Sequence, residues 1–128
     1  MSDIIWNHIT AKTSKEKDTF LINSFGLRYD EITASNLVEI TLDGKVINSE
    51  SNINDTGFII HGAIHRVRTD INCVMHTHSR AGLAVSCFTE GLTPMIQDAA
   101  IFHNRVSYYD WRGLSTDSEE CEHLSKSL

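Results

Sequence analysis

Two histidines separated by a single residue, His76 and His78, are the side chains of this sequence best suited to metal chemistry. They follow an apolar run, 71–75, that predicts a buried strand. Because side chains two positions apart on a strand point to the same face of the sheet, the two imidazoles are expected to converge. Neutral imidazole is a good ligand for zinc and other divalent ions. The spacing therefore predicts part of a metal site, with a purely structural pair of histidines as the open alternative.

The segment after the histidine pair indicates where the pair lies in the fold. Ser79 is suited to cap a helix over 79–88, so the histidines would stand where a strand ends and a helix begins. In open α/β sheets ligands bind at this edge. The expected position therefore favours a binding role for the pair.

Strands and helices alternate along the chain, which predicts an α/β fold. Strands are expected over 4–10, 18–22, 37–42, 71–76 and 105–109, and helices after Thr56, over 79–88 and over 95–102. Gly26 follows the second strand in a turn that favours positive φ. Asp43-Gly44 predicts a hairpin turn that returns through 45–47. Thr56 is the expected N-cap of the helix that precedes the histidine strand.

Composition narrows the class of protein. A chain of 128 residues with 41% hydrophobic residues predicts one globular domain over residues 1–128. The net charge of −6, without a basic stripe, argues against nucleic-acid binding. No apolar run reaches the roughly 20 residues of a membrane span, so no membrane partner is expected. The first residues lack the basic start and apolar core of a secretory signal, so a cytoplasmic location is expected.

Other candidate ligands give weaker signals. His61 and His65 are four residues apart on a predicted helix and share a face. Their spacing is that of a zinc-binding helix, but Gly62 stands where such a helix carries its general base, so a metal site there is disfavoured. Buried, unreactive thiols are the prediction for the three widely spaced cysteines, Cys73, Cys87 and Cys121.

Several segments, in order along nearly the whole chain, together resemble the class II aldolase and adducin family, in particular its adducin-like bacterial branch. These segments are 6–10 with Asn7, 20–33 with Gly26, 57–65, 74–81 with the histidine pair, and 108–113. The resemblance implies a three-layer α/β/α fold with a mixed, mainly antiparallel central sheet, incomplete at its termini.

The resemblance also implies a chemistry. The active members of the family are zinc-dependent lyases or epimerases of sugar phosphates, with three histidine ligands and a glutamate as acid and base. The metal polarises the substrate oxygens, and the carboxylate moves the proton. By the resemblance, His76 and His78 bind zinc or another divalent metal. A small sugar phosphate would be bound by Asn7, Gly26 and Thr56, partly through backbone N–H groups. A plain turn at Gly26 and a plain helix cap at Thr56 stay open.

Two departures from the family pattern reduce the expected activity. The third ligand of the family lies in a segment that this chain does not reach, and Gly57 occupies the position of the glutamate. Asp55, Glu90 and Asp98 are possible substitute acids, none of them singled out by spacing. We therefore expect weak or absent metal binding and impaired or lost lyase activity. The alternatives are a non-catalytic, adducin-like interaction or scaffold module, or a fragment of a longer protein.

The last segment predicts assembly. Residues 116–119 have the spacing of a helix capping box. Cys121, Leu124 and Leu128 then share one helix face, which nothing later in the sequence would cover. An uncovered apolar stripe of this kind favours self-association, so a homo-oligomer is expected.

Overall fold

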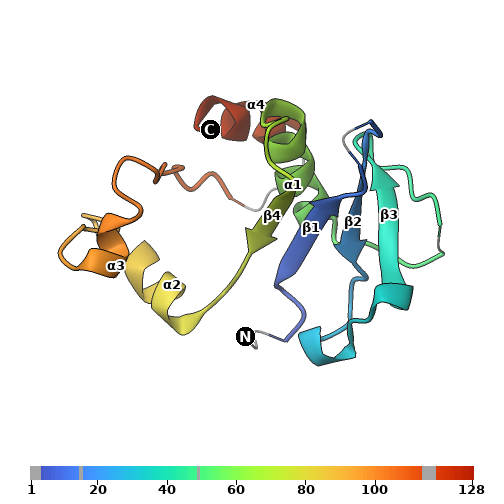
Figure 1. Ribbon diagram of the computed structural model, residues 1–128, viewed down its shortest axis with the longest axis horizontal. Helices are drawn as coiled ribbons and strands as arrows, with labels where there is room; N and C mark the ends of the chain where they lie inside the picture. Colours follow the sequence, from blue (N-terminus) through green and yellow to red (C-terminus); the bar gives the residue numbers. More distant parts are fainter. Residues whose placement is uncertain (1–3, 15, 49, 114–117) are drawn as a thin grey trace.

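The computed structural model describes residues 4–14, 16–48, 50–113 and 118–128. Its centre is a four-stranded antiparallel sheet in the order β3-β2-β1-β4 (Figure 1). The strands are β1 (His8–Lys12), β2 (Thr19–Asn23), β3 (Leu37–Thr41) and β4 (Cys73–His76). The register pairs His8 directly with His76 across β1 and β4. The sheet therefore brings an N-terminal histidine to the histidine pair predicted to bind metal.

Helix α1 (Asp55–Val67) covers one face of this sheet. The other helices are α2 (Arg80–Ser86), α3 (Gln97–Ala100) and α4 (Ser118–Lys126), and 3-10 turns lie at Tyr29–Glu31 and Ala34–Asn36. In Figure 1, α1 lies against the sheet with α4 beside it, while α2 and α3 lead away from the end of β4. Within the described ranges, none of these helices has the length and apolar character needed to cross a bilayer.

The apolar core lies between α1 and the strands β2 and β3. Phe20, Ile22, Val38 and Ile40 are fully buried at alternating positions of these two strands. The ring of Phe58 on α1 packs against this cluster. The core thus fixes α1 over one half of the sheet.

The other half of the interface with α1 is polar. His8 and Thr10 occupy the same face of β1, and both are buried. The residues of α1 that meet them are His61 and His65, which are also buried. Hydrogen bonds rather than apolar contacts therefore join β1 to α1.

The α/β class and most of the expected elements are confirmed. Gly26 and Gly44 adopt positive φ angles of 91° and 89° in the two predicted turns. The mainly antiparallel sheet that was expected is found, and all strand pairings in its described part are antiparallel. The return of the Gly44 hairpin is reduced to a single bridge between Ile40 and Val46. The sheet face opposite α1 carries the 3-10 turn at Tyr29–Glu31 in place of a helical layer in the residues described.

Some local predictions are wrong for a physical reason. Segment 105–109 forms no strand in the structure, because it has no neighbouring strand to complete a ladder. The helix expected over 95–102 contracts to α3. The N-cap of α1 is Asn54, whose side chain accepts from the N–H of Thr56, so Thr56 is not the cap.

Burial at the chain's later positions also differs from the predictions. Cys73 and Cys87 are exposed, because Cys73 lies on the open face of β4 and Cys87 follows α2, which buries no residue. The apolar stripe of α4 is partly covered, since Cys121 and Leu124 are half-buried where α4 packs on α1. Leu128 remains 45% exposed. The predicted capping box over 116–119 lies partly outside the described residues.

The core predicts the effect of one matched pair of substitutions. Ile40→Ala should lower the free energy of unfolding by about 2–5 kcal/mol, because it empties a fully buried site. Ile47→Ala, at a residue that is 51% exposed, should cost less than about 1 kcal/mol. Urea unfolding of both variants measures the difference. Equal destabilisation would show that the core is not centred on β2 and β3.

Candidate metal site

The end of β4 places the histidine pair. The strand ends at His76, and Ser79 caps α2 by accepting a hydrogen bond from the N–H of Gly82 at 3.1 Å. His78 lies in the bend between them, where its N–H donates to the Asn7 side-chain oxygen at 2.6 Å. The two imidazoles converge as their spacing predicted, with their Nε2 atoms 2.8 Å apart.

The geometry of the pair fits two ligands of one ion. Two nitrogens that each lie about 2.0–2.1 Å from a zinc ion are roughly 2.9–3.4 Å apart for octahedral to tetrahedral angles. The 2.8 Å between the Nε2 atoms of His76 and His78 needs only a small opening to reach that range. In the described part of the chain, no group of three histidine, cysteine or carboxylate side chains could hold a metal. The described residues thus offer two candidate ligands, His76 and His78.

The predicted phosphate-binding residues have different surroundings. Asn7 is buried beside the histidine pair, and its Nδ2 has no hydrogen-bond partner among the described residues. Thr56 lies in the first turn of α1 and donates its hydroxyl to the Asn54 side-chain oxygen at 2.7 Å. Gly26 lies in the exposed turn after β2. The rings of Trp6 and Phe25, 6.3 Å apart, join this turn to the segment that carries Asn7.

His8 is the residue that sequence reasoning missed. Its ring stacks on that of His76, with centroids 4.5 Å apart and planes 10° apart. A Cβ atom at Gly57 would come within 3.2 Å of the His8 ring. The absence of a side chain at position 57 therefore leaves the space that the His8 imidazole fills.

A continuous series of hydrogen bonds leads from His8 along α1. His8 Nδ1 lies 2.8 Å from His61 Nε2, and His61 Nδ1 lies 2.8 Å from the Thr10 hydroxyl. The same hydroxyl lies 2.8 Å from His65 Nε2. We call His8, His61, Thr10 and His65 the histidine chain. It occupies both nitrogens of His61 with structural bonds, so the zinc-helix arrangement considered for His61 and His65 is not formed.

Burial makes these histidines weak bases. Desolvation lowers the pKa of His61 to about 3, and the neighbouring imidazoles of His8, His76 and His65 add to the effect. Desolvation, with the Lys12 ammonium as a lesser cause, lowers the pKa of His65 to about 4. The pKa of His76 is lowered by burial first and by His78 second. Neutral rings at pH 7 are the form that binds a metal ion.

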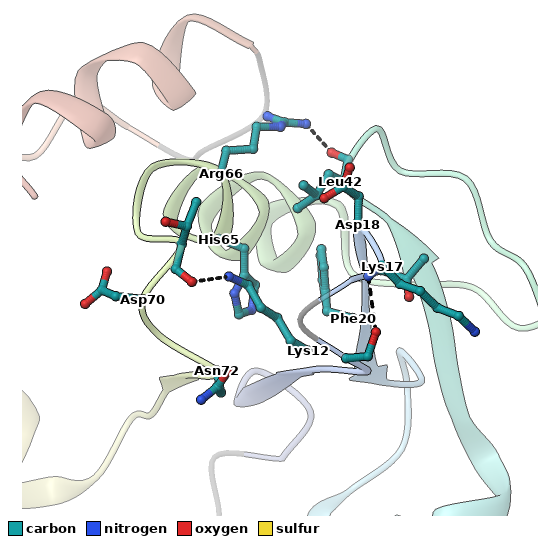
Figure 2. A pocket seen from close by; sticks show the side chains of 12 residues that line it. Lys12, Lys17, Asp18, Phe20, Leu42, His65, Arg66, Asp70 and Asn72 are labelled. Carbon is teal, nitrogen blue, oxygen red and sulfur yellow. Dashed lines mark hydrogen bonds between the residues drawn. The ribbon is translucent and has the colours of Figure 1, made fainter.

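The His65 end of the histidine chain reaches a cavity (Figure 2). This cavity, of about 410 Å³, is lined by His65 together with Lys12, Lys17 and Arg66 from three different segments. Figure 2 shows the Lys12 side chain beside His65. The Nδ1 atom of His65 is buried and has no partner among the described residues. The histidine chain therefore runs along β1 and α1 from the candidate metal site to this cavity.

Similar chains are found among proteins of the aldolase class 2 type and among adducins. The sequence matches the family described as Class II Aldolase and Adducin N-terminal domain over residues 1–128. A solved aldolase II superfamily protein from Pseudomonas syringae superposes with a TM-score of 0.94 at 43% identity, over 99% of this chain and 52% of that chain. An L-fuculose 1-phosphate aldolase from Glaciozyma antarctica superposes with a TM-score of 0.83 at 28% identity, over 99% of this chain and 49% of that chain.

Sequence identity extends to animal proteins. Alpha-adducin of Rattus norvegicus is 41% identical over 130 residues, which cover 99% of this chain and 18% of the adducin. The chain spans about half the length of the bacterial curated relatives that it matches.

The buried histidines predict how stability depends on pH. Unfolded histidine takes up a proton as the pH falls below about 6.5. Folded His61 and His65 do so only near pH 3 and 4, so the unfolded state binds more protons between these values. The free energy of unfolding should therefore fall with pH below 6.5, by up to about 1.4 kcal/mol per pH unit for each histidine. Urea unfolding between pH 7.5 and 4.5 measures the slope.

One substitution isolates the contribution of His65 to this pH dependence of stability. His65→Gln keeps a side-chain amide within reach of Thr10 and removes the titration. The slope of the unfolding free energy against pH, below pH 6.5, should then decrease by about 1.4 kcal/mol per pH unit. An unchanged slope would mean that His65 titrates normally in the folded protein.

The close contact at Gly57 predicts a second matched pair. Gly57→Ala places a Cβ 3.2 Å from the ring of His8, which is stacked on His76. Gly62→Ala, in the same helix, meets Phe58 at an ordinary 3.4 Å. Both changes gain helix propensity of about 1 kcal/mol, so the difference between them isolates the contact. Gly57→Ala should be less stable than Gly62→Ala by about 1–3 kcal/mol in urea unfolding. Equal stabilities would show that the His8 ring is free to move.

Proposed function

The chain belongs to the class II aldolase and adducin family, and we propose that it binds a divalent metal and a small sugar phosphate with impaired or lost lyase activity. The observation that carries the proposal is the 2.8 Å between the Nε2 atoms of His76 and His78. Two half-buried imidazoles that converge in this way form a partial site for zinc or a similar ion.

Each residue of the site has a part in this proposal. His76 and His78 hold the ion, and Asn7 fixes His78 through its backbone N–H. A bound divalent ion supplies a Lewis acid that polarises a carbonyl or hydroxyl oxygen of the ligand. With two protein ligands the ion is held less firmly than in a catalytic zinc site, which usually keeps three.

The ligand we propose is an anion of the sugar-phosphate class. One observation supports it directly, which is the buried Nδ2 of Asn7, without a partner among the described residues. The dipole of α1 at its first turn also favours an anion, and Thr56 would contribute its N–H or hydroxyl in place of their bonds to the Asn54 side chain. The aldolase of Glaciozyma antarctica, whose name specifies L-fuculose 1-phosphate, shares this fold at 28% identity. Gly26 would add a backbone N–H from the exposed turn.

Loss of lyase turnover follows from Gly57. A glycine cannot move a proton, and the alternative acids Asp55, Glu90 and Asp98 are all exposed. The second candidate function, a non-catalytic interaction module, is favoured by the 41% identity to rat alpha-adducin. The two functions differ in one measurable property, which is metal binding.

Self-association is part of the proposal. The segments around α2 and α3 expose large apolar side chains, namely Leu83, Phe88, Met95, Ile96, Ile101 and Phe102. An apolar surface of this kind is uncommon on monomeric proteins and favours a homo-oligomer. A cytoplasmic location stays a prediction.

Metal titration tests the proposal. Competition with a chromophoric chelator should give a zinc dissociation constant in the micromolar range for the wild-type chain, weaker than sites with three protein ligands. His76→Ala and His78→Ala should each abolish binding, whereas His103→Ala, at an exposed histidine outside the pair, should not change it. Binding that survives both substitutions would contradict the site.

Turnover is measured on the same samples. Cleavage of L-fuculose 1-phosphate with added zinc should not exceed the background, because position 57 carries no acid or base. Metal-dependent cleavage would show that another carboxylate moves the proton. Absence of zinc binding by the wild-type chain would favour the interaction module instead.

A further inference from the structure

The histidine chain determines which nitrogen of each ring carries a proton. Two imidazole nitrogens that are 2.8 Å apart share one hydrogen, so one ring donates and the other accepts. The Thr10 hydroxyl has one hydrogen and two lone pairs, so it cannot donate to both of its imidazole partners. If it accepted from both, its own hydrogen would be buried without an acceptor among the described residues, because Thr10 is fully buried and its hydroxyl bonds only His61 and His65 there. Thr10 therefore donates to one imidazole and accepts from the other. The bonds therefore run in a single direction from one end of the chain to the other.

Two directions are possible, and they leave different atoms without a partner. If His65 donates to Thr10, then Thr10 donates to His61 and His61 donates to His8 Nδ1. Within the histidine chain, His65 Nδ1 is then the one buried nitrogen without a partner among the described residues, and it carries a bare lone pair. In the reverse direction His65 Nδ1 carries a buried hydrogen that has no acceptor among the described residues. Buried N–H groups without a partner are rarer and more costly than buried lone pairs, so the first direction is favoured.

We propose that His8 is a fixed hydrogen-bond donor of the candidate metal site, held by the histidine chain in the tautomer that carries its proton on Nε2. In the favoured direction His8 Nδ1 accepts from His61, which leaves the proton on the other nitrogen. The ring cannot turn over without breaking that bond. His8 is thus a donor, and neither a base nor a third ligand.

The position of the ring fits this role. His8 Nε2 is among the atoms that a side chain at position 57 would meet, at 3.3 Å. The parallel stack on His76 places the His8 ring directly against a proposed metal ligand. A small residue at position 57 and an imidazole at position 8 are therefore complementary, since one leaves the space that the other fills.

The role rests on the proposed function in one respect, which is the identity of the acceptor. A sugar-phosphate ligand would carry anionic oxygens, and a neutral imidazole N–H is a suitable donor to an oxygen of this kind. The acceptor we infer is an anionic oxygen of the bound ligand. The tautomer itself does not depend on whether metal binds.

Nitrogen NMR of the metal-free protein tests the tautomer directly. Long-range proton–nitrogen spectra of protein enriched in nitrogen-15 histidine distinguish the two neutral tautomers and the charged ring. We expect His8, His61 and His65 each to carry the proton on Nε2 at pH 7. A proton on His8 Nδ1, or a charged His8 ring, would overturn the proposal.

A pair of threonine substitutions tests whether the histidine chain holds the His8 ring in one tautomer. Thr10→Val removes the shared hydroxyl, so the direction of the bonds is no longer fixed and His8 should become a mixture of tautomers. Thr19→Val removes a hydroxyl of β2 that bonds Glu39 and does not belong to the histidine chain. This substitution should leave the His8 signals unchanged. A single, unchanged His8 tautomer in Thr10→Val would show that the histidine chain does not set it.

Binding of a small anionic probe tests whether His8 donates a hydrogen bond to a ligand. The probe is glycolohydroxamate, a small mimic of an enediolate, added to zinc-loaded protein. His8→Phe should weaken its binding by about tenfold, as expected for one lost hydrogen bond to a charged group. His8→Gln, which keeps an N–H donor, should bind within about threefold of wild type. Circular dichroism establishes that both variants fold.

The outcomes separate this proposal from the function on which it rests. Equal probe affinity of wild type and His8→Phe, at unchanged zinc affinity, would overturn the donor role and leave the metal site standing. If wild-type protein binds no zinc, the proposed function fails, and the NMR tautomer decides alone whether His8 is a fixed donor.

Discussion

The hydrogen bonds between β1 and α1 are the constraint on which the candidate site depends. An apolar contact tolerates small rotations of a helix over a sheet, because dispersion and hydrophobic burial have no strong direction. A hydroxyl placed 2.8 Å from two imidazoles does not tolerate them. Thr10 therefore fixes one rotation of α1, and with it the position of Gly57 relative to β1. The apolar cluster of β2 and β3 supplies the burial, and the polar half of the interface supplies the orientation.

This division explains why buried histidines are tolerated in a small protein. Burial of an unpaired polar group is costly, but each nitrogen of His61 has a partner. The remaining unpartnered nitrogen, on His65, lies at the edge of the interface beside a cavity. The cost of the network is thus confined to one atom at its end.

Local spacing was sufficient to predict part of this arrangement. The convergence of His76 and His78 depends on strand geometry alone, and the shared face of His61 and His65 depends on helix geometry alone. The place of His8 depends on which strands pair and in which register, and no short-range pattern contains that information. The alternation of His8 and Thr10 with Ile9 and Ala11 was the one available signal, because a polar face on β1 implies a polar partner.

The wrong predictions share another cause. Segment 105–109 and the two exposed cysteines were judged from residue types whose preference for strands or for the interior is a tendency. Strand formation and burial both require a neighbour. The part of the chain after β4 contacts the sheet little in the described residues, so composition alone could not decide these positions.

The strand that ends in the histidine pair is also the last strand of the sheet in the described part of the chain, and it is only four residues long. Its backbone is paired on one side, by β1. Short edge strands open more readily than central ones, so His76, and His78 just beyond the strand, lie in a part of the protein with a low local unfolding free energy. Opening of this strand would release any ion bound there. The residence time of the ion would then be limited by the lifetime of a few backbone hydrogen bonds as well as by the metal–nitrogen bonds.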